Sequence, residues 1–165
     1  MKYIEEFRDK DLIKKLIRHI GMVMRGKYVF MEVCGGHTSA IHRFGIPSML
    51  PSGISLISGP GCPVCVTAMD FIDRAIVLAG YSDVIIATFG DLIRVPGSSS
   101  SLERKRSAGA DVRIIFSPLD ALDIARENPG KKVVFAGIGF ETTAPATAVT
   151  VLQAGKEKIG NFYVL

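Results

Sequence analysis

The chain has 165 residues, 48% of them hydrophobic and 22% charged, and 20 basic and 16 acidic side chains give a formal net charge of +4. This length and the positive mean hydropathy suit one folded domain, or one domain and part of another, and exclude a disordered chain. The basic residues are scattered and are not interleaved with aromatic side chains, as a nucleic-acid groove requires. No apolar run reaches the ~18–20 residues that span a bilayer, and the polar start lacks the apolar stretch of a signal peptide. We therefore expect a cytoplasmic protein that binds neither nucleic acid nor membrane.

Short apolar segments alternate with helical patterns along the chain. The first helix is predicted over 9–25, with Asp9 or Asp11 as its cap and Gly26 as its stop. A buried strand is predicted over 28–33, and further strands over 54–58, 83–88, 112–116, 132–137 and 162–165. Further helices are predicted over 66–79, 118–130 and 145–158, and Ser117-Pro118 opens the second of these in cap-then-first-turn order.

This alternation is typical of βαβ units, so the predicted fold class is α/β, with a parallel β-sheet flanked by helices. Residues 1–115 are expected to form a first α/β domain. Residues 116–165 begin a second, similar α/β domain. Because the strand at 162–165 has no turn or tail after it, we expect the second domain to be truncated.

Four unusual segments each come directly after a predicted strand. They are CGGHT (34–38), GPGCPVC (59–65), TFGDLIRVPGS (88–98) and GFETTAP (139–145). All strands of a parallel sheet end at one edge, and open α/β folds bind their ligands there. The four segments are therefore predicted to converge on one site.

The cysteines indicate redox or metal chemistry. Three is an odd number, and Cys62 and Cys65 form a C-x-x-C pair at a predicted helix entrance, where the helix dipole favours a thiolate. Such a pair can close a reversible disulfide, and the Gly-Pro-Gly before it lets the backbone turn sharply. The alternative is a pair of buried structural cysteines. Cys34 is followed by two glycines that let another molecule approach the sulfur, and His37 can ligate a metal, orient a ligand or tune the thiol.

Two other functions remain open at this point. Cys34, His37, Cys62 and Cys65 supply the ligands of a closed Cys₃His zinc site, which would make the protein a zinc-stabilised interaction domain. Strand ends of an α/β sheet are not the hairpins of a zinc knuckle, and this chain has core enough to fold without metal, which argues against that reading. The other alternative is a thiol–disulfide oxidoreductase that uses Cys62 and Cys65 alone.

Five polar residues in the later segments are further candidates. Asp91, Arg94 and Glu141 stand in Gly-rich loops, where ion pairs and loop hydrogen bonds are as ordinary a role as a functional one. Thr142 and Thr143 are candidate cofactor contacts, and they are equally placed to cap the following helix.

Together the segments EVCGGHT (32–38), GPGCPVC (59–65), TFGDLIRVPGS (88–98) and GFETTAP (139–145) resemble, in the same order, the signature segments of the HypD family. The resemblance runs through essentially the whole chain. It implies a hydrogenase maturation scaffold with two similar α/β domains facing a cleft, and not a classical turnover enzyme. On this scaffold, in complex with the small chaperone HypC, iron would gain CO and two cyanides to become the Fe(CN)₂CO group of [NiFe]-hydrogenase. The cyanide would arrive through the HypE/HypF pair.

The resemblance also implies residue roles. Cys34 corresponds to the family's iron-linked cysteine, and Cys62 and Cys65 to its redox-active dithiol. The residues that match Asp91, Arg94 and Glu141 line or support the cleft in the family.

The chain departs from the family pattern in two ways. The family usually has a second histidine after CGGHT, and Ser39 stands there instead. The family also runs to more than twice this length, and a [4Fe–4S] cluster is expected in its C-terminal extension. The three cysteines of this chain are too few for a Cys₄-ligated cluster, so the ligands of that cluster are absent from it.

Overall fold

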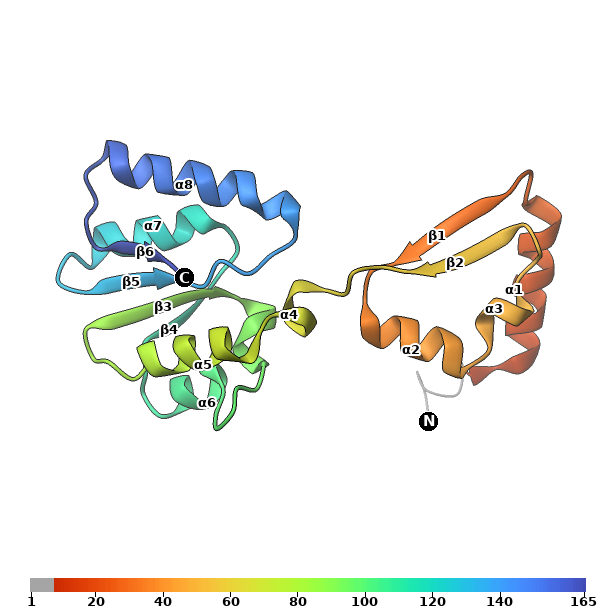
Figure 1. The fold of residues 1–165 in the computed structure, drawn as a ribbon, viewed down its shortest axis with the longest axis horizontal. Helices are drawn as coiled ribbons and strands as arrows, with labels where there is room; N and C mark the ends of the chain where they lie inside the picture. Colours follow the sequence, from red (N-terminus) through yellow and green to blue (C-terminus); the bar gives the residue numbers. More distant parts are fainter. Residues whose placement is uncertain (1–7) are drawn as a thin grey trace. The chain divides into compact units, whose positions relative to one another are not determined.

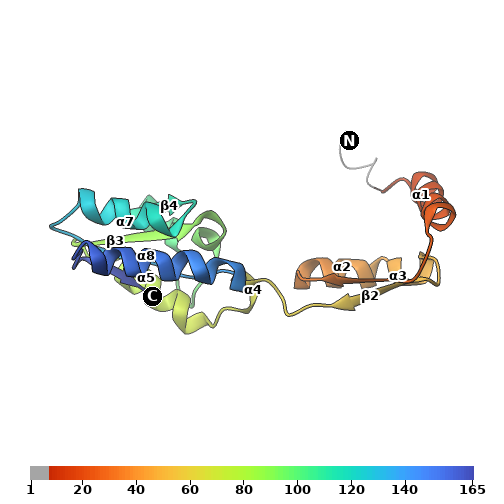
Figure 2. The same cartoon turned by 90° about the horizontal axis from the view of Figure 1, so that it is seen from above.

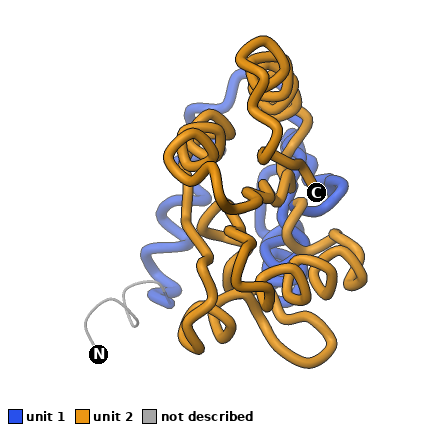
Figure 3. Tube along the Cα trace, turned by 90° about the vertical axis from the view of Figure 1, so that its left-hand side faces the viewer, with its two compact units in different colours: residues 1–62 blue, residues 63–165 orange. Residues whose placement is uncertain are grey.

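The computed structural model describes residues 8–165, which form two compact units divided between Cys62 and Pro63 (Figure 3). Each unit has its own sheet, and every strand pairing in both sheets is parallel. Helices lie against both sheets (Figure 1). The predicted α/β class with parallel sheets and flanking helices is therefore confirmed. Within residues 8–165, no helix has both the length and the apolar character to cross a membrane.

The first unit is a single βαβ arrangement preceded by a helix. Its elements are α1 (Lys10–Val23), β1 (Tyr28–Glu32), α2 (Gly35–Arg43), α3 (Ile46–Met49) and β2 (Ile54–Ser58). The carboxylate of Asp9 caps α1 by accepting the N–H groups of Asp11 and Leu12, both at 2.9 Å, as predicted. Strands β1 and β2 pair in register from Tyr28 opposite Ile54 to Glu32 opposite Ser58. Helices α2 and α3 connect them across one face (Figures 1 and 2).

The side chains of the first unit are poorly covered. None of residues 8–62 is fully buried, and Val29 and Phe30 of β1 remain 65% and 54% exposed. The prediction that 28–33 is a buried strand is therefore wrong about burial, although the strand itself is present. The physical reason is that two strands and two short helices provide too little surface to cover an apolar strand on both faces.

The second unit is a four-stranded sheet in the order β4-β3-β5-β6. Helices α5 and α6 lie on one face, and α7 and α8 lie on the other (Figure 1). The elements in chain order are α4 (Pro63–Val66), α5 (Met69–Leu78), β3 (Val84–Phe89), the 3₁₀ helix η2 (Gly90–Arg94), α6 (Leu102–Ser107), β4 (Val112–Ile115), α7 (Pro118–Glu127), β5 (Lys132–Phe135), the 3₁₀ helix η3 (Glu141–Thr143), α8 (Ala144–Lys156) and β6 (Phe162–Val164).

Strand β3 lies in the middle of the core because both of its faces are covered. Ile86 packs with α5, and Ile85 packs with α7 on the opposite face; both are completely buried. Phe135 of β5 is also fully buried and meets Phe89 edge to face, with ring centroids 5.5 Å apart. A strand covered on both faces is expected to be almost continuously apolar, and β3 has this pattern with Thr88 as its one polar residue.

Most predicted elements are confirmed, with shifts at their ends. Ser117 caps α7 in a capping box with Asp120, as the Ser-Pro pair predicts. The predicted helix over 66–79 is in fact two helices, α4 and α5. Helices α2, α3 and α6 were not predicted. The domain boundary predicted after residue 115 falls between β4 and α7, inside the second unit, and that division stays a prediction.

Candidate functional site

Cys34 lies at the junction between β1 and α2. It is the N-cap residue of α2, with extended backbone angles, and its carbonyl accepts the first helical N–H, from Thr38, at 2.9 Å. The thiol is half-buried. A Cβ on Gly35 would meet nothing within 4 Å, and one on Gly36 would stay 3.8 Å from the Cys34 sulfur. The space beside the sulfur is therefore open within this unit, as the two glycines suggested.

The loop that carries Cys62 leaves the sheet next to Cys34. The N–H of Gly59 donates to the carbonyl of Glu32 at 2.8 Å and continues the β1–β2 pairing by one residue. A Cβ on Gly59 would lie 2.9 Å from that same carbonyl oxygen, so only glycine fits here. Gly61 has φ +88°, a conformation that glycine adopts without strain. The CGGHT and GPGCPVC segments therefore begin side by side at one edge of the first sheet.

The two cysteines of the C-x-x-C pair flank the start of α4. Cys62 is half-buried and directly precedes the helix, whereas Cys65 lies within it and is exposed. The predicted position at a helix entrance is confirmed. Because α4 has only four residues, its dipole is much weaker than that of the long helix that the sequence predicted.

Glu32 contacts both candidate residues of the CGGHT segment, Cys34 and His37. Its Oε1 accepts the N–H of Cys34 at 2.8 Å and lies 3.4 Å from Nδ1 of His37. The Glu32 side chain is 31% exposed, and that of His37 is 73% exposed. His37 therefore has a carboxylate on one ring nitrogen and an open approach to the rest of the ring.

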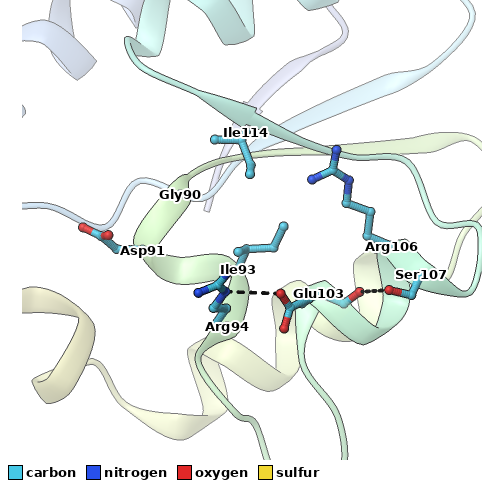
Figure 4. A pocket seen from close by; sticks show the side chains of 8 residues that line it. All are labelled: Gly90, Asp91, Ile93, Arg94, Glu103, Arg106, Ser107 and Ile114. Atoms are coloured by element: carbon cyan, nitrogen blue, oxygen red, sulfur yellow. Dashed lines mark hydrogen bonds and ion pairs between the residues drawn. The ribbon is translucent and has the colours of Figure 1, made fainter. Parts of the chain in front are cut away.

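Asp91 and Arg94 follow β3 and line a cavity of about 660 Å³ with residues of α6 and β4 (Figure 4). Arg94 Nε lies 3.2 Å from a carboxylate oxygen of Glu103, and Arg106 extends from α6 toward Ile114. The Asp91 side chain makes no hydrogen bond or ion pair with the described residues. The remaining lining residues are Gly90, Ile93 and Ser107.

The end of the TFGDLIRVPGS segment is held by α5. The carboxylate of Asp73 accepts the Ser98 hydroxyl at 2.6 Å and the Ser98 N–H at 2.7 Å. These two bonds, the hydroxyl one first, hold the pKa of Asp73 below its ordinary value. A Cβ on Gly97 would collide with the Asp73 carboxylate and would lie 2.7 Å from Ile76 Cδ1. The Pro-Gly-Ser run therefore packs closely against α5 and is held there by the two hydrogen bonds to Asp73.

Glu141, Thr142 and Thr143 form η3 after β5. The hydroxyl of Thr143 donates to the carbonyl of Phe140 at 2.7 Å and makes no capping bond to α8. The expectation that Thr143 caps this helix through its side chain is therefore wrong, because the hydroxyl turns back into its own loop. Gly139 makes room for it, since a Cβ there would collide with the Thr143 side chain. Glu141 and Thr142 are exposed, and their side chains make no hydrogen bond to the described residues.

The predicted residues thus gather in two groups, one in each unit. Cys34, His37 and Cys62 follow the paired strands β1 and β2. The segments with Asp91 and Glu141 follow β3 and β5, which also pair in parallel. Strand β3 leads to α6 on one face and β5 leads to α8 on the other, which makes the space between them the topological switch point of this sheet. That all four segments meet at one site stays a prediction.

Groups of possible metal ligands are the next feature of the described residues. Among residues 8–165, no three His, Cys, Asp or Glu side chains are gathered closely enough to hold a metal ion. In particular, Cys34, His37 and Cys62 do not form a ready ligand set.

Sequence reasoning missed Glu32, Asp73 and Glu103. Glu32 could have been noticed, because it is the one charged residue in the apolar segment YVFMEV. Asp73 and Glu103 gave no such signal. Both lie on helices, and the residues they hold are distant in sequence or in another element.

Comparisons with known proteins cover nearly the whole chain. Residues 11–165 match the HypD family model, described as "Hydrogenase formation hypA family". The chain is 48% identical over 171 residues to "Hydrogenase maturation factor HypD" of Rhodobacter capsulatus, covering 99% of this chain and 45% of that protein. It is 46% identical over 170 residues to the factor of the same name from Escherichia coli K12, covering 99% of this chain and 46% of that protein. A third relative is "Hydrogenase maturation factor HypD2" of Bradyrhizobium diazoefficiens. The chain is 51% identical to it over 167 residues, which cover 99% of this chain and 44% of that protein.

The chain belongs to the HypD family. It spans about half the length of the curated relatives that it matches. All four HypD-like segments lie inside the matched region, so the resemblance seen in the sequence is confirmed at the level of the family.

Proposed function

We propose that this chain is the cysteine-bearing part of a hydrogenase maturation scaffold. In this proposal the longer protein assembles the Fe(CN)₂CO group with the chaperone HypC, and the cyanide comes through HypE and HypF. The observation that carries it is the pairing of β1 with β2, which releases the CGGHT and GPGCPVC segments from one sheet edge, tied by the Gly59–Glu32 bond of 2.8 Å. The names of the relatives support the maturation role.

The residue roles follow from the placement of each side chain. Cys34 presents a thiolate to the iron, which is the substrate here and not a resident cofactor; thiolates suit a soft, low-spin iron. The thiol loses its proton on binding. In this proposal the iron takes its further ligands from HypC and from the CO and cyanide that it gains.

Cys62 and Cys65 act as the redox pair. Closing a disulfide between them releases two electrons and two protons, which are then available to the chemistry on the iron. Cys65 is exposed at the start of the second unit, where a partner can reach it. Asp91, Arg94 and Glu141 act at the switch point of the second sheet, where open α/β folds bind ligands. Thr142 and Thr143 stay candidate ligand contacts in the same loop.

The test is iron retention in the complex of the full-length protein with HypC. Cys34→Ala should abolish retention and leave thermal unfolding nearly unchanged, since the side chain is small and only half-buried, and its loss costs on the order of 1 kcal/mol. Cys62→Ala is the matched comparison for thermal unfolding alone, since it also removes a half-buried cysteine.

Two results would contradict this proposal. Iron retained by Cys34→Ala would remove the assigned role of that thiol. Loss of folding in both cysteine variants, together with stoichiometric zinc in the purified protein, would favour the closed zinc site instead. The redox role has its own measurement: thiol titration before and after mild reductant should differ by two groups.

A further inference from the structure

Glu32 is the residue through which the two cysteine segments are connected. Its backbone carbonyl accepts the N–H of Gly59, the first residue of the GPGCPVC segment, at 2.8 Å. Its carboxylate accepts the N–H of Cys34 at 2.8 Å and lies 3.4 Å from His37 Nδ1. One side chain therefore holds the backbone at Cys34 and faces the imidazole three residues later.

The position of Glu32 makes these contacts specific. Glu32 is the last residue of β1, and the alternation of a strand puts it on the same face as Phe30, toward α2. From there the carboxylate reaches past Val33 to the N–H of Cys34, at the beginning of α2. An alanine at this position has no side-chain oxygen and could make neither contact.

The carboxylate also decides which nitrogen of His37 is available. A neutral imidazole carries one proton, on either Nδ1 or Nε2, and the nitrogen without it offers a lone pair. A negative oxygen near Nδ1 favours the proton on that nitrogen. Metal-binding histidines are commonly oriented in this way, with a carboxylate on the N–H opposite the ligating nitrogen.

We propose that Glu32 is a positioning residue: it fixes the backbone of Cys34 and holds the proton of His37 on Nδ1, so that Nε2 keeps its lone pair for a ligand or a proton. This rests on the proposed function to the extent that Cys34 and His37 act there. His37 is 73% exposed, so its ring is open to an incoming group. The two cysteine segments are thus held by one residue that carries out no chemistry itself.

The tautomer can be observed directly in the 15N-labelled chain, by histidine ring ¹H–¹⁵N correlation spectra recorded about two pH units above the ordinary imidazole pKa of ~6.5. We expect His37 to carry its proton on Nδ1. The other two histidines, His19 and His42, have no ion pair in the described part of the chain and report the unbiased tautomer in the same spectrum.

Two variants separate the two tasks of Glu32. In Glu32→Gln, the amide oxygen can still accept the Cys34 N–H, so exchange of that amide should be unchanged. That oxygen still faces Nδ1 but carries no charge, so the fraction of His37 protonated on Nδ1 should fall toward that of His19 and His42. In Glu32→Ala, the tautomer should revert to that of His19 and His42, and the Cys34 amide should exchange about fivefold faster because its hydrogen bond is lost. Glu103→Gln, which removes a carboxylate paired with Arg94 in the other unit, is the matched control and should change neither reading.

Two results would overturn the inference. The first is a wild-type His37 with the same tautomer as His19 and His42. The second is a Cys34 amide that exchanges equally fast in wild type and Glu32→Ala. Neither measurement involves iron, so failure of the scaffold proposal, seen as iron retained by Cys34→Ala, is distinguishable from failure of the role given to Glu32.

Discussion

Replacing Gly59 with alanine is expected to disrupt the edge of the first sheet from which both cysteine segments leave. The added Cβ would lie 2.9 Å from the carbonyl oxygen of Glu32, 3.0 Å from Val33 Cα and 3.1 Å from Met31 Cγ. Two of these three atoms belong to the backbone and cannot rotate away. Strand β2 must therefore separate from β1 at its carboxyl end.

The magnitude follows from these contacts. Forcing one extra carbon into a filled space costs about 1–3 kcal/mol. Separation of the strands also stretches the 2.8 Å bond from Gly59 to Glu32, whose net contribution is on the order of 1 kcal/mol. Since 1.4 kcal/mol corresponds to a factor of about ten in an equilibrium constant, the equilibrium constant for opening the β1–β2 pair should rise at least about tenfold.

Amide hydrogen exchange measures this opening residue by residue. In Gly59→Ala, exchange should accelerate about tenfold or more across β1 and β2, while the amides of β3 and β5 keep the wild-type rate. Gly35→Ala is the matched control, because a Cβ there meets nothing within 4 Å. At the start of α2, alanine is favoured over glycine by about 0.5–1 kcal/mol, so α2 should exchange more slowly. Unchanged exchange in β1 and β2 of Gly59→Ala would refute the steric argument.

Two other predictions concern the core and the α5 contact. Val133→Ala, at a fully buried position, should cost about 2 kcal/mol in urea unfolding, whereas Val29→Ala, at a side chain 65% exposed, should cost less than about 0.5 kcal/mol; equal costs would contradict the core assignment. Because its hydrogen bonds to Ser98 lower the pKa of Asp73 in the folded state, the stability they provide is present above the unfolded pKa of ~3.9 and is lost as the pH falls through the lowered folded value. Amide exchange at Ser98 should therefore rise on acidification below about pH 4 beyond its intrinsic pH dependence, and Asp73→Asn should lack this extra rise.

The positions of the strands could be predicted from the sequence because short apolar, β-branched runs mark them. ISLIS at 54–58 is β2 without a shift of either end, and the apolar run at 83–88 is β3 displaced by one residue. Burial was not readable in the same way. The segments at β1 and β3 both consist mainly of apolar residues, yet β3 is covered on both faces and β1 is largely exposed. What covers a strand depends on the elements packed against it, and the strand's own residues do not determine that.

Helix α2 could not be predicted from local rules. It begins with two glycines, which are poor helix formers, and its N-cap is a cysteine that makes no side-chain capping bond. The Glu32 carboxylate of β1 takes the N–H of Cys34, one of the N–H groups at the helix start that have no partner within the helix. This contact with the preceding strand is not one that a search for a capping residue would find.

The contact between Asp73 and Ser98 in the second unit could not be predicted from the sequence either. Asp73 holds Ser98 across 25 residues, and the residues between them include the whole of β3 and η2. Nothing in the helical pattern at α5 distinguishes Asp73 from Asp70, which pairs with Arg74 on its own helix. Only the packing of α5 beside the Pro-Gly-Ser run selects one of the two carboxylates.

The neighbourhood of the TFGDLIRVPGS and GFETTAP segments is a consequence of strand order. If the strands of the second sheet were arranged as they occur in the chain, β4 would lie between β3 and β5 and would separate the two segments. In the observed order, β4 is at the edge and β3 pairs directly with β5, from Val84 opposite Lys132 to Ala87 opposite Phe135. The two connections then leave toward opposite faces and open the sheet edge between them. Asp91 and Glu141 thus belong to neighbouring loops because the connection from β4 to β5 passes over β3 and places β5 on its other side. The residues of that connection lie outside both motifs.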